Sequence, residues 1–191
     1  PVSRRAVAIA VIILLMAGPA TTADTVKVFL LAGQSNMEGK AKNELITHQG
    51  TDAKTKHHFE HLRDGNDWRE RDDVFIKFLN RHGGLTIGYG SPGKTGPELE
   101  FGHMMGEYFE EPVLLIKAAW GGHSLYQKFR PPSAGMPADE VLKAELKKAQ
   151  ERVRKASEKK KKDDPLPTME DIKAPYGSSY ANMFKEVEDT F

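Results

Sequence analysis

Two short and nearly continuous apolar runs stand out in the pattern of hydrophobic and polar positions, at residues 26–32 and 113–119. The first run stops at Gly33, and the second leads within two residues to Gly121. Runs of this length that end at glycine-rich turns are typical of β-strands covered on both faces. We therefore expect two buried strands that open into loops, with residues 73–79 supplying a further strand between them.

A helix is expected before the last of these strands, because Pro97 is followed by apolar residues at spacings of three and four. That apolar stripe consists of Phe101, Met104, Met105 and Tyr108. A helix followed by a buried strand and a glycine-rich turn is typical of a crossover connection, which predicts an α/β fold with a parallel sheet. The glycine-rich residues 86–96 are interpreted as a loop near the site.

A second helix is predicted over residues 138–156, where Leu142, Leu146 and Val153 recur at helical spacing. Residues 143–162 hold ten Lys or Arg against three Glu, which leaves 18 basic and 24 acidic residues in the rest of the sequence. Such a segment can bind nucleic acid, anionic lipid or another polyanion. A solvated helix face is the interpretation that we favour, because no aromatic residue lies among these lysines to stack on a base.

The N-terminal residues have the pattern of a secretory signal peptide. Two arginines precede the uncharged run 6–17, and small residues follow it up to Ala23. The run is shorter than the roughly 20 residues that cross a bilayer, so a membrane anchor is the less favoured alternative. We expect residues 1–23 to be removed and residues 24–191 to form one secreted or periplasmic domain, with the basic segment, about 138–164, as an insertion. The absence of cysteine excludes thiol catalysis and cysteine-ligated metals.

Ser35 is the first candidate for chemistry, because the pentapeptide from Gly33 to Met37 directly follows the first predicted strand. Open α/β sheets place their sites outside the carboxyl ends of strands, where a serine is well placed to act as a nucleophile. Serine is also a favoured helix N-cap, so capping of the following helix is the alternative interpretation.

Donors for an oxyanion are expected close to this serine. An acyl-transfer enzyme needs N–H groups that stabilise the negative charge on the carbonyl oxygen of the tetrahedral intermediate. The backbone of Gly121 or Gly122 can supply one, and the Ser35 N–H and the Asn36 side chain are further candidates. A plain tight turn behind a core strand is the alternative interpretation of the two glycines.

Three motifs in a fixed order carry a resemblance to a known family: GQSNMEG at 33–39, GPEL with FG at 96–102, and IK with WGG and SL at 116–125. Together they resemble the sialate O-acetylesterase and acetylxylan esterase group of the SGNH hydrolases, also described as carbohydrate esterase family six. The resemblance covers most of the sequence from Val26 to Leu125 and resumes weakly at Tyr176. It implies a flavodoxin-like, three-layer α/β/α fold and hydrolysis of acetyl esters on carbohydrates without a metal or other cofactor.

The resemblance also implies roles for individual residues. Ser35 matches the family nucleophile, whose N–H contributes to the oxyanion hole, and Gly121 matches the next oxyanion donor. Glu98 falls in the GPEL segment, where it lies at the site rim or caps its helix. His123 is interpreted as a substrate-facing or turn residue. The residues expected to contact the substrate are Gln34, Glu98, Trp120, Gly122 and His123.

The general base of the family is missing from this sequence. A serine hydroxyl needs a base to take its proton, and the family supplies a histidine in an Asp-x-x-His motif near the C-terminus. Here His123 is the last histidine, and no Asp is followed by His three positions later. The apolar stripe of Tyr180, Phe184 and Phe191 runs to the last residue without a helix cap. We therefore interpret the chain as the N-terminal part of a longer esterase and expect it to hydrolyse little by itself.

Two other classes of function stay open. The chain can be a noncatalytic carbohydrate-binding module that uses Trp120 as a stacking platform, although a tryptophan at a strand end more often belongs to the core. It can also be a polyanion-interacting protein that uses the basic helix. In the esterase interpretation, the partner is an acetylated carbohydrate of sialate or xylan type, with no nucleic acid and no stable membrane association after signal cleavage.

Overall fold

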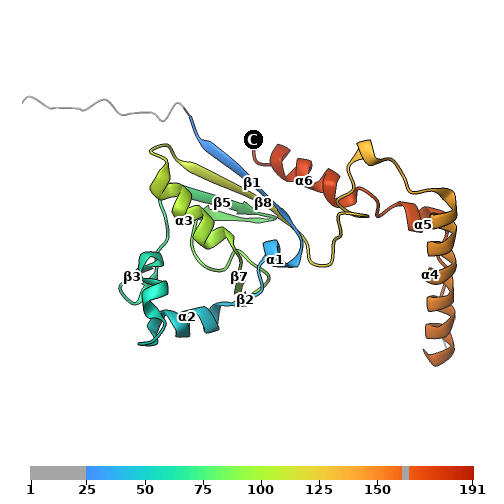
Figure 1. Ribbon diagram of the computed structural model, residues 1–191, viewed down its shortest axis with the longest axis horizontal. Coiled ribbons are helices and arrows are strands. Elements are labelled where there is room, and N and C mark those ends of the chain that lie inside the picture. Colours follow the sequence, from blue (N-terminus) through green and yellow to red (C-terminus); the bar gives the residue numbers. More distant parts are fainter. Residues whose placement is uncertain (1–24, 161–163) are drawn as a thin grey trace, which may run out of the picture.

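The computed structural model describes residues 25–160 and 164–191 of the chain (Figure 1). The expected signal peptide, residues 1–23, lies outside the described residues, and so do Lys161 and Lys162 of the basic segment.

A mixed sheet forms the centre of the molecule, with β1, β8, β5 and β6 as neighbours in that order. Both β1 and β5 pair in parallel with β8, whereas β6 is antiparallel to β5. Two small antiparallel ladders, β2 with β7 and β3 with β4, lie outside this sheet. The strands are β1 (Lys27–Gly33), β2 (Ala41–Lys42), β3 (Arg63–Asp64), β4 (Asp67–Trp68), β5 (Val74–Phe78), β6 (Arg81–Gly84), β7 (Lys94–Thr95) and β8 (Val113–Ala119).

Helices cover both faces of the sheet. The α-helices of the described residues are α1 (Ser35–Glu38), α2 (Asn43–Thr51), α3 (Glu98–Tyr108), α4 (Asp139–Lys160), α5 (Met169–Lys173) and α6 (Ser178–Glu188). Short 3-10 turns occur at Lys56–His58, Glu60–Leu62 and Pro132–Ala134. Helix α3 packs on one face, and α6 packs on β8 from the other, where Lys77 of β5 pairs with Glu186 at 3.1 Å. The predicted three-layer α/β/α arrangement is confirmed.

The three predicted strands are confirmed as β1, β5 and β8, but the sheet is not wholly parallel. Strand β6 returns alongside β5 after only Leu79 and Asn80. Leu79 has a φ of 55°, a left-handed conformation that is unusual for a residue with a side chain. The parallel pairing of β1, β8 and β5 confirms the predicted parallel sheet. The antiparallel strand β6 was not predicted, because this reversal lacks the glycine that normally marks such a turn.

The buried face of α3 differs from the predicted apolar stripe. Met104 is 59% exposed and Tyr108 is 76% exposed, whereas Leu99, Gly102 and His103 are buried. A Cβ atom at Gly102 would collide with Leu85 and Leu115 of the core, so the absence of a side chain lets the helix backbone approach the sheet. The core beneath α3 consists of Val74, Ile76, Leu85, Val113 and Leu115, with Phe29, Leu31, Phe101 and Met105 packed against it.

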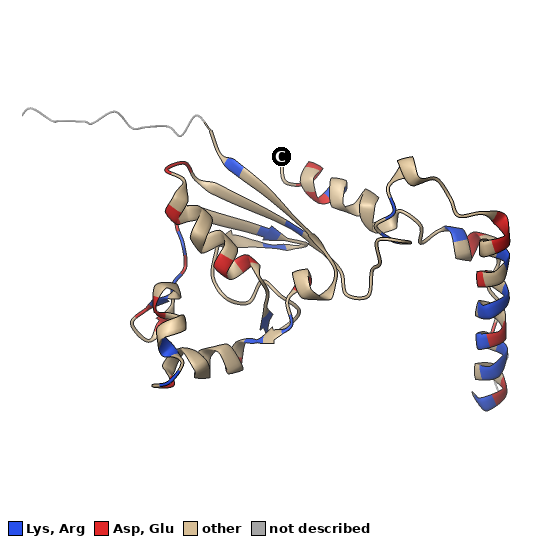
Figure 2. Ribbon diagram, viewed as in Figure 1, with Lys and Arg blue, Asp and Glu red and all other residues tan. Residues whose placement is uncertain are grey.

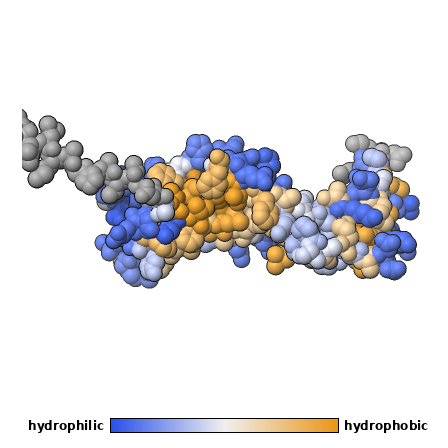
Figure 3. Space-filling model, turned by 90° about the horizontal axis from the view of Figure 1, so that it is seen from above, coloured by the Kyte–Doolittle hydropathy of each residue, from blue (hydrophilic) through white to orange (hydrophobic). Residues whose placement is uncertain are grey.

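Two regions remain open to solvent. The predicted basic helix is confirmed as α4, which extends away from the sheet and contacts α5 (Figure 1). Strand β1 is at the edge of the sheet, and Val28 and Leu30 are exposed on it. Figure 3 shows hydrophobic surface gathered next to the point where the described chain begins. Among the described residues, no helix combines the length and the apolar character that crossing a bilayer requires.

Candidate functional site

Ser35 is the first residue of α1 and lies just beyond the carboxyl end of β1. Gly33 is in register with Ala119 at the end of β8, and the Trp120 amide donates to the Gly33 carbonyl at 3.1 Å. The GQSNM segment and the WGG turn therefore follow the carboxyl ends of two neighbouring parallel strands, at the same end of the sheet. Topology brings Ser35 and Gly121 to one end of the fold, as the motifs predict.

Ser35 is half-buried, and its side chain does not cap a helix. The N-cap of α1 is Gln34, and no side chain makes a cap hydrogen bond there. The Ser35 hydroxyl has no hydrogen bond with any described residue, which leaves it available to a substrate or a base. Gln34 and Asn36, on either side, are exposed to solvent.

A cleft of about 550 Å³ lies at the ends of β5 and β8. Glu38, three residues after Ser35, lines it together with residues of the WGG turn and of the hairpin between β5 and β6. Trp120 and His123 stack, with an angle of 20° between their ring planes. Leu79, with its positive φ, also lines the cleft. The polar or aromatic lining residues are Glu38, Asn80, Arg81, Ser91, Trp120 and His123.

Glu38 joins α1 to the turn that holds Gly121. Its carboxylate accepts hydrogen bonds from Ser91 Oγ at 2.6 Å and from Lys40 Nζ at 2.9 Å. Burial raises the pKa of Glu38, but these two donors, the charge of Lys40 and the backbone of Gly121 outweigh it and lower the pKa. A Cβ atom at Gly121 would lie 2.8 Å from Glu38 Oε2, so a side chain there would displace the Glu38 carboxylate. Gly122 is exposed with a φ of 77°, which also favours glycine.

His123 is engaged by two partners, neither of which is Ser35. Lys128 Nζ lies 3.0 Å from Nε2, and Ser179 Oγ lies 2.6 Å from Nδ1. A lysine ammonium can only donate, so Nε2 accepts and Nδ1 carries the hydrogen that it donates to Ser179. Burial, followed by the charge of Lys128, lowers the pKa of His123. The ring is therefore a neutral link between the cleft and α6.

None of the other histidines contacts Ser35, and all seven in the sequence lie within the described residues. His61 pairs with Glu100 at 2.8 Å, and His57 and His58 stack on each other. His103 is buried in α3, where burial, followed by the charges of nearby arginines, lowers its pKa to about 4. The remaining two are His48 on α2 and His82 on β6.

The assignment of Glu98 to the substrate site is wrong. Its side chain is completely buried, and it pairs with Lys117 Nζ at 2.5 Å. The Glu98 carboxylate also accepts the Gly96 amide at 2.8 Å, so it closes the start of α3. A group without exposed surface cannot contact a sugar.

Lys117 is a central polar residue that motif reasoning did not assign a role. Its ammonium donates to Glu98, to the Tyr89 carbonyl at 2.8 Å and to the Glu38 carbonyl at 3.0 Å. It also lies 4.7 Å from the centre of the Phe78 ring. Burial lowers the pKa of Lys117, and the charge of Glu98 opposes that shift. One buried cation thus connects β8 to the end of α1, to the loop that contains Tyr89 and to α3.

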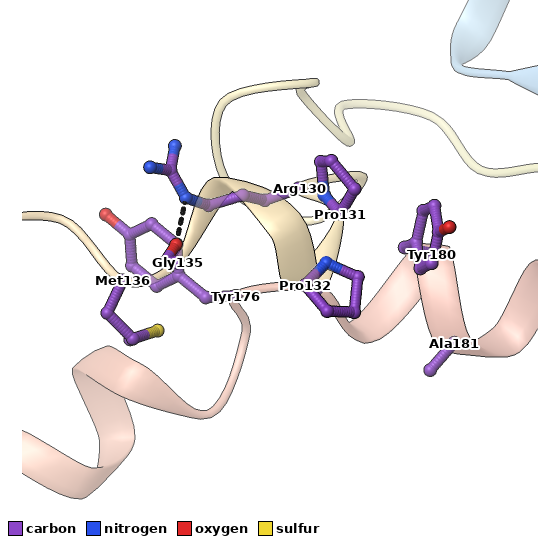
Figure 4. A pocket seen from close by; sticks show the side chains of 9 residues that line it. Arg130, Pro131, Pro132, Gly135, Met136, Tyr176, Tyr180 and Ala181 are labelled. Carbon is purple, nitrogen blue, oxygen red and sulfur yellow. Dashed lines mark hydrogen bonds between the residues drawn. The ribbon is translucent and has the colours of Figure 1, made fainter.

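A second pocket, of about 310 Å³, lies between the loop after β8 and the start of α6 (Figure 4). Arg130 Nε donates to the Gly135 carbonyl at 2.6 Å, and its Nη2 donates to the Ala134 carbonyl at 3.0 Å. The Arg130 guanidinium therefore stabilises the loop of residues 130–135 to which it belongs. No acid, histidine or serine lines this pocket, which is formed by Arg130, Pro131, Pro132, Gly135, Met136, Tyr176, Gly177, Tyr180 and Ala181. Among the described residues, no three His, Asp or Glu side chains cluster closely enough to hold a metal ion.

Comparison with known proteins identifies the family. A family model described as carbohydrate esterase, sialic acid-specific acetylesterase, matches residues 25–162. No curated protein and no solved structure shows significant similarity to the chain. The matched segment includes α1 with Ser35, the buried Glu98 and Lys117 pair and the WGG turn, and it covers well over half of the sequence. The chain therefore belongs to the carbohydrate esterase family of sialic acid-specific acetylesterases.

Proposed function

We propose that the protein is a serine esterase that removes O-acetyl groups from carbohydrates, with Ser35 as its nucleophile. The observation that carries this proposal is the position of Ser35, whose unbonded hydroxyl lies beyond β1 at the same sheet edge as Gly121. A cleft at the ends of β5 and β8, with Trp120 and polar side chains in its wall, is suited to a sugar. Glu38 and Gly121 line this cleft, and Ser35 does not.

The reaction proceeds through an acetyl-enzyme. The Ser35 oxygen bonds to the acetyl carbonyl carbon while its proton passes to a general base. Negative charge on the carbonyl oxygen is stabilised by the backbone N–H of Ser35 and by the Asn36 amide. The Gly121 N–H contributes only when it turns from the Glu38 carboxylate, which accepts its hydrogen bond in this structure, to the substrate. The bond to the sugar oxygen then breaks, and that oxygen takes the proton from the base. Water attacks the acetyl group on Ser35 by the reverse proton path and releases acetate.

We further propose that the base is a histidine supplied by polypeptide outside this sequence. Support comes from the seven histidines of the chain, none of which contacts Ser35, and from His123 in particular, whose two ring nitrogens already have partners. The exposed edge of β1 beside Ser35 offers a place where such a segment can pack. The acetylated sugar is of sialate or xylan type, and the enzyme acts outside the cytoplasm after removal of residues 1–23.

Chemical rescue tests the nucleophile and the missing base together. Release of acetate from an acetylated sugar is measured with and without added imidazole, for the wild-type chain and for Ser35→Ala. We expect slow release without imidazole, an increase with imidazole in the wild type, and only the background reaction of imidazole in Ser35→Ala. Equal rescue of both proteins would exclude Ser35, and fast release by the wild type without imidazole would exclude an external base.

A noncatalytic carbohydrate-binding protein is the second candidate, favoured by Trp120 in the cleft wall. It predicts that the same sugars change the tryptophan fluorescence without any release of acetate, whether or not imidazole is present.

A further inference from the structure

Helix α4 is rich in Lys and Arg, which alternate with Asp and Glu along its length (Figure 2). Lys148, Arg152, Lys155 and Lys159 follow one another at steps of four, three and four residues, which places them side by side on the helix surface. At a rise of 1.5 Å per residue, this basic row spans about 16 Å. All four residues are exposed.

The four cations of the basic row are not engaged by bonded partners. None of their side chains forms a hydrogen bond or salt bridge with another described residue. Like charges three or four residues apart destabilise a helix, and Glu151, at such a spacing from Lys148 and Lys155, offsets part of that cost. The charged groups of the row are therefore available to an external partner.

The partner is not a membrane inserted against the apolar side of α4, because that side is already covered. Leu142 is 1% exposed, and Leu146 and Val153 are half-buried on the same side. Hydrogen bonds from Gln150 to the Pro167 carbonyl and from Tyr176 to Glu145 fix the following segment against the helix. An interfacial helix needs a free apolar face to enter the lipid.

Single-stranded nucleic acid is also disfavoured by the composition of α4. The helix contains no aromatic residue, so bases have no platform on which to stack beside the cations. A linear polymer whose charged groups recur along its length needs no such platform, because it binds through its anions alone.

We propose that the basic row is a docking surface for a linear polysaccharide that carries carboxylate or sulfate groups. The family is one of carbohydrate esterases, which makes an anionic carbohydrate the class of polyanion that fits the protein best. The row lies on a helix that extends away from the sheet (Figure 1). No residue of α4 lines the cleft, so a polymer bound to the row leaves the cleft free. The proposal does not depend on Ser35 being the nucleophile.

A matched pair of triple variants tests the docking surface. Lys148→Glu, Arg152→Glu and Lys155→Glu alter the basic row, whereas Lys143→Glu, Lys147→Glu and Arg154→Glu make the same change of charge, with two lysines and one arginine, on the other flank of α4. Binding of fluorescently labelled polygalacturonate is followed by anisotropy. We expect affinity that falls steeply with salt, a loss of about tenfold or more for the row variant, and a loss under about threefold for the flank variant.

Further controls test whether the variants fold and which class of polymer binds. Circular dichroism checks that α4 stays helical, and the milder set Lys148→Gln, Arg152→Gln and Lys155→Gln replaces the row variant if it unfolds. Neutral dextran is expected not to bind. Equal losses in the two triple variants, or equal binding of dextran, would overturn the docking surface. Tighter binding of a single-stranded oligonucleotide or of phosphatidylserine vesicles than of polygalacturonate would overturn the assignment to a polysaccharide.

Discussion

Ser35 follows β1 and Lys117 belongs to the neighbouring parallel strand β8, yet the polar groups of these two residues have opposite environments. Lys117 is completely buried, and its ammonium has three hydrogen-bond acceptors, one of them the carboxylate of Glu98. Ser35 is half-buried, and its hydroxyl has no hydrogen bond with a described residue. Burying a charge is costly unless it is paired, so the Lys117 cluster must stay intact for the fold to form.

The difference separates a group that builds the site from a group that can react in it. Lys117 holds the Glu38 carbonyl at the end of α1 and the Tyr89 carbonyl in the loop beside the cleft. Glu38 in turn contacts the Gly121 turn. The interior of the sheet thus fixes the backbone around Ser35 and leaves the serine hydroxyl unengaged. The predictions below follow from this contrast.

The largest effect is expected from removing the Lys117 charge. Lys117→Met leaves the buried carboxylate of Glu98 unpaired, which should lower the free energy of unfolding by about 3–5 kcal/mol. Urea denaturation measures it. Lys27→Met is the control, because the Lys27 and Glu111 pair is more than one-third exposed on both sides and should matter by less than about 1 kcal/mol.

The double variant Lys117→Met with Glu98→Met sharpens this comparison, because it removes both charges and should recover part of the loss. Similar effects of Lys117→Met and Lys27→Met would contradict a structural role for the buried pair.

A smaller effect is expected where α3 approaches the sheet. Gly102→Ala places a methyl group against Leu85 and Leu115, and this overpacking should cost about 1–3 kcal/mol despite the better helix propensity of alanine. Met104→Ala on the exposed side of the same helix is the control and should have little effect. Thermal unfolding measures both, and a stabilised Gly102→Ala would show that the helix is free to move outward.

A pH-dependent effect below about 1 kcal/mol is expected from Glu38, whose carboxylate is partly open to solvent. Its pKa is lowered in the fold, so its contribution is fully present above the ordinary value of 4.5 and is lost as pH falls through the lower folded value. Glu38→Gln should therefore be less stable than the wild type at pH 7, and the difference should shrink below pH 4.5. A difference that is constant with pH would contradict the role of the charge.

The smallest effect on stability is expected at Ser35 itself. Because its hydroxyl has no partner to lose, Ser35→Ala should change the free energy of unfolding by less than about 0.5 kcal/mol. Urea denaturation compares it with Ser179→Ala, which removes a buried hydroxyl from His123 and should cost more. A large loss for Ser35→Ala would mean that Ser35 serves the fold.

Local pattern predicted the interior of this molecule better than its edges. The apolar runs predicted β1, β5 and β8, but of these only β8 is buried almost throughout, as a strand covered on both faces should be. The expectation that the first run is a buried strand is wrong, because β1 lies at the edge of the sheet with Val28 and Leu30 exposed. The turn at Leu79 between β5 and β6 was not predicted, because it contains no glycine. The buried side of α3 was predicted only in part: Phe101 and Met105 pack against the core as expected, whereas Gly102 and His103 are buried in place of Met104 and Tyr108.

The site was only partly readable from the sequence. Motif order and parallel strands were enough to place Ser35 and Gly121 at one edge, because register follows from pairing with β8. Glu98 was assigned to the substrate site because it falls in the GPEL segment that carries the family resemblance, and a sequence motif does not reveal whether a carboxylate is buried. The missing signal was Lys117, a lone charge in an otherwise apolar strand, which needs a buried counterion. The partners of His123 come from Lys128 and α6, and only the fold brings these together.

The most direct measurement is the site of covalent labelling by a fluorophosphonate, located by mass spectrometry of the digested protein with imidazole present. The account predicts an adduct on the peptide that contains Ser35 and none on that peptide in Ser35→Ala. An adduct on another serine, such as Ser124 or Ser179, with unchanged labelling of Ser35→Ala, would contradict Ser35 as the nucleophile.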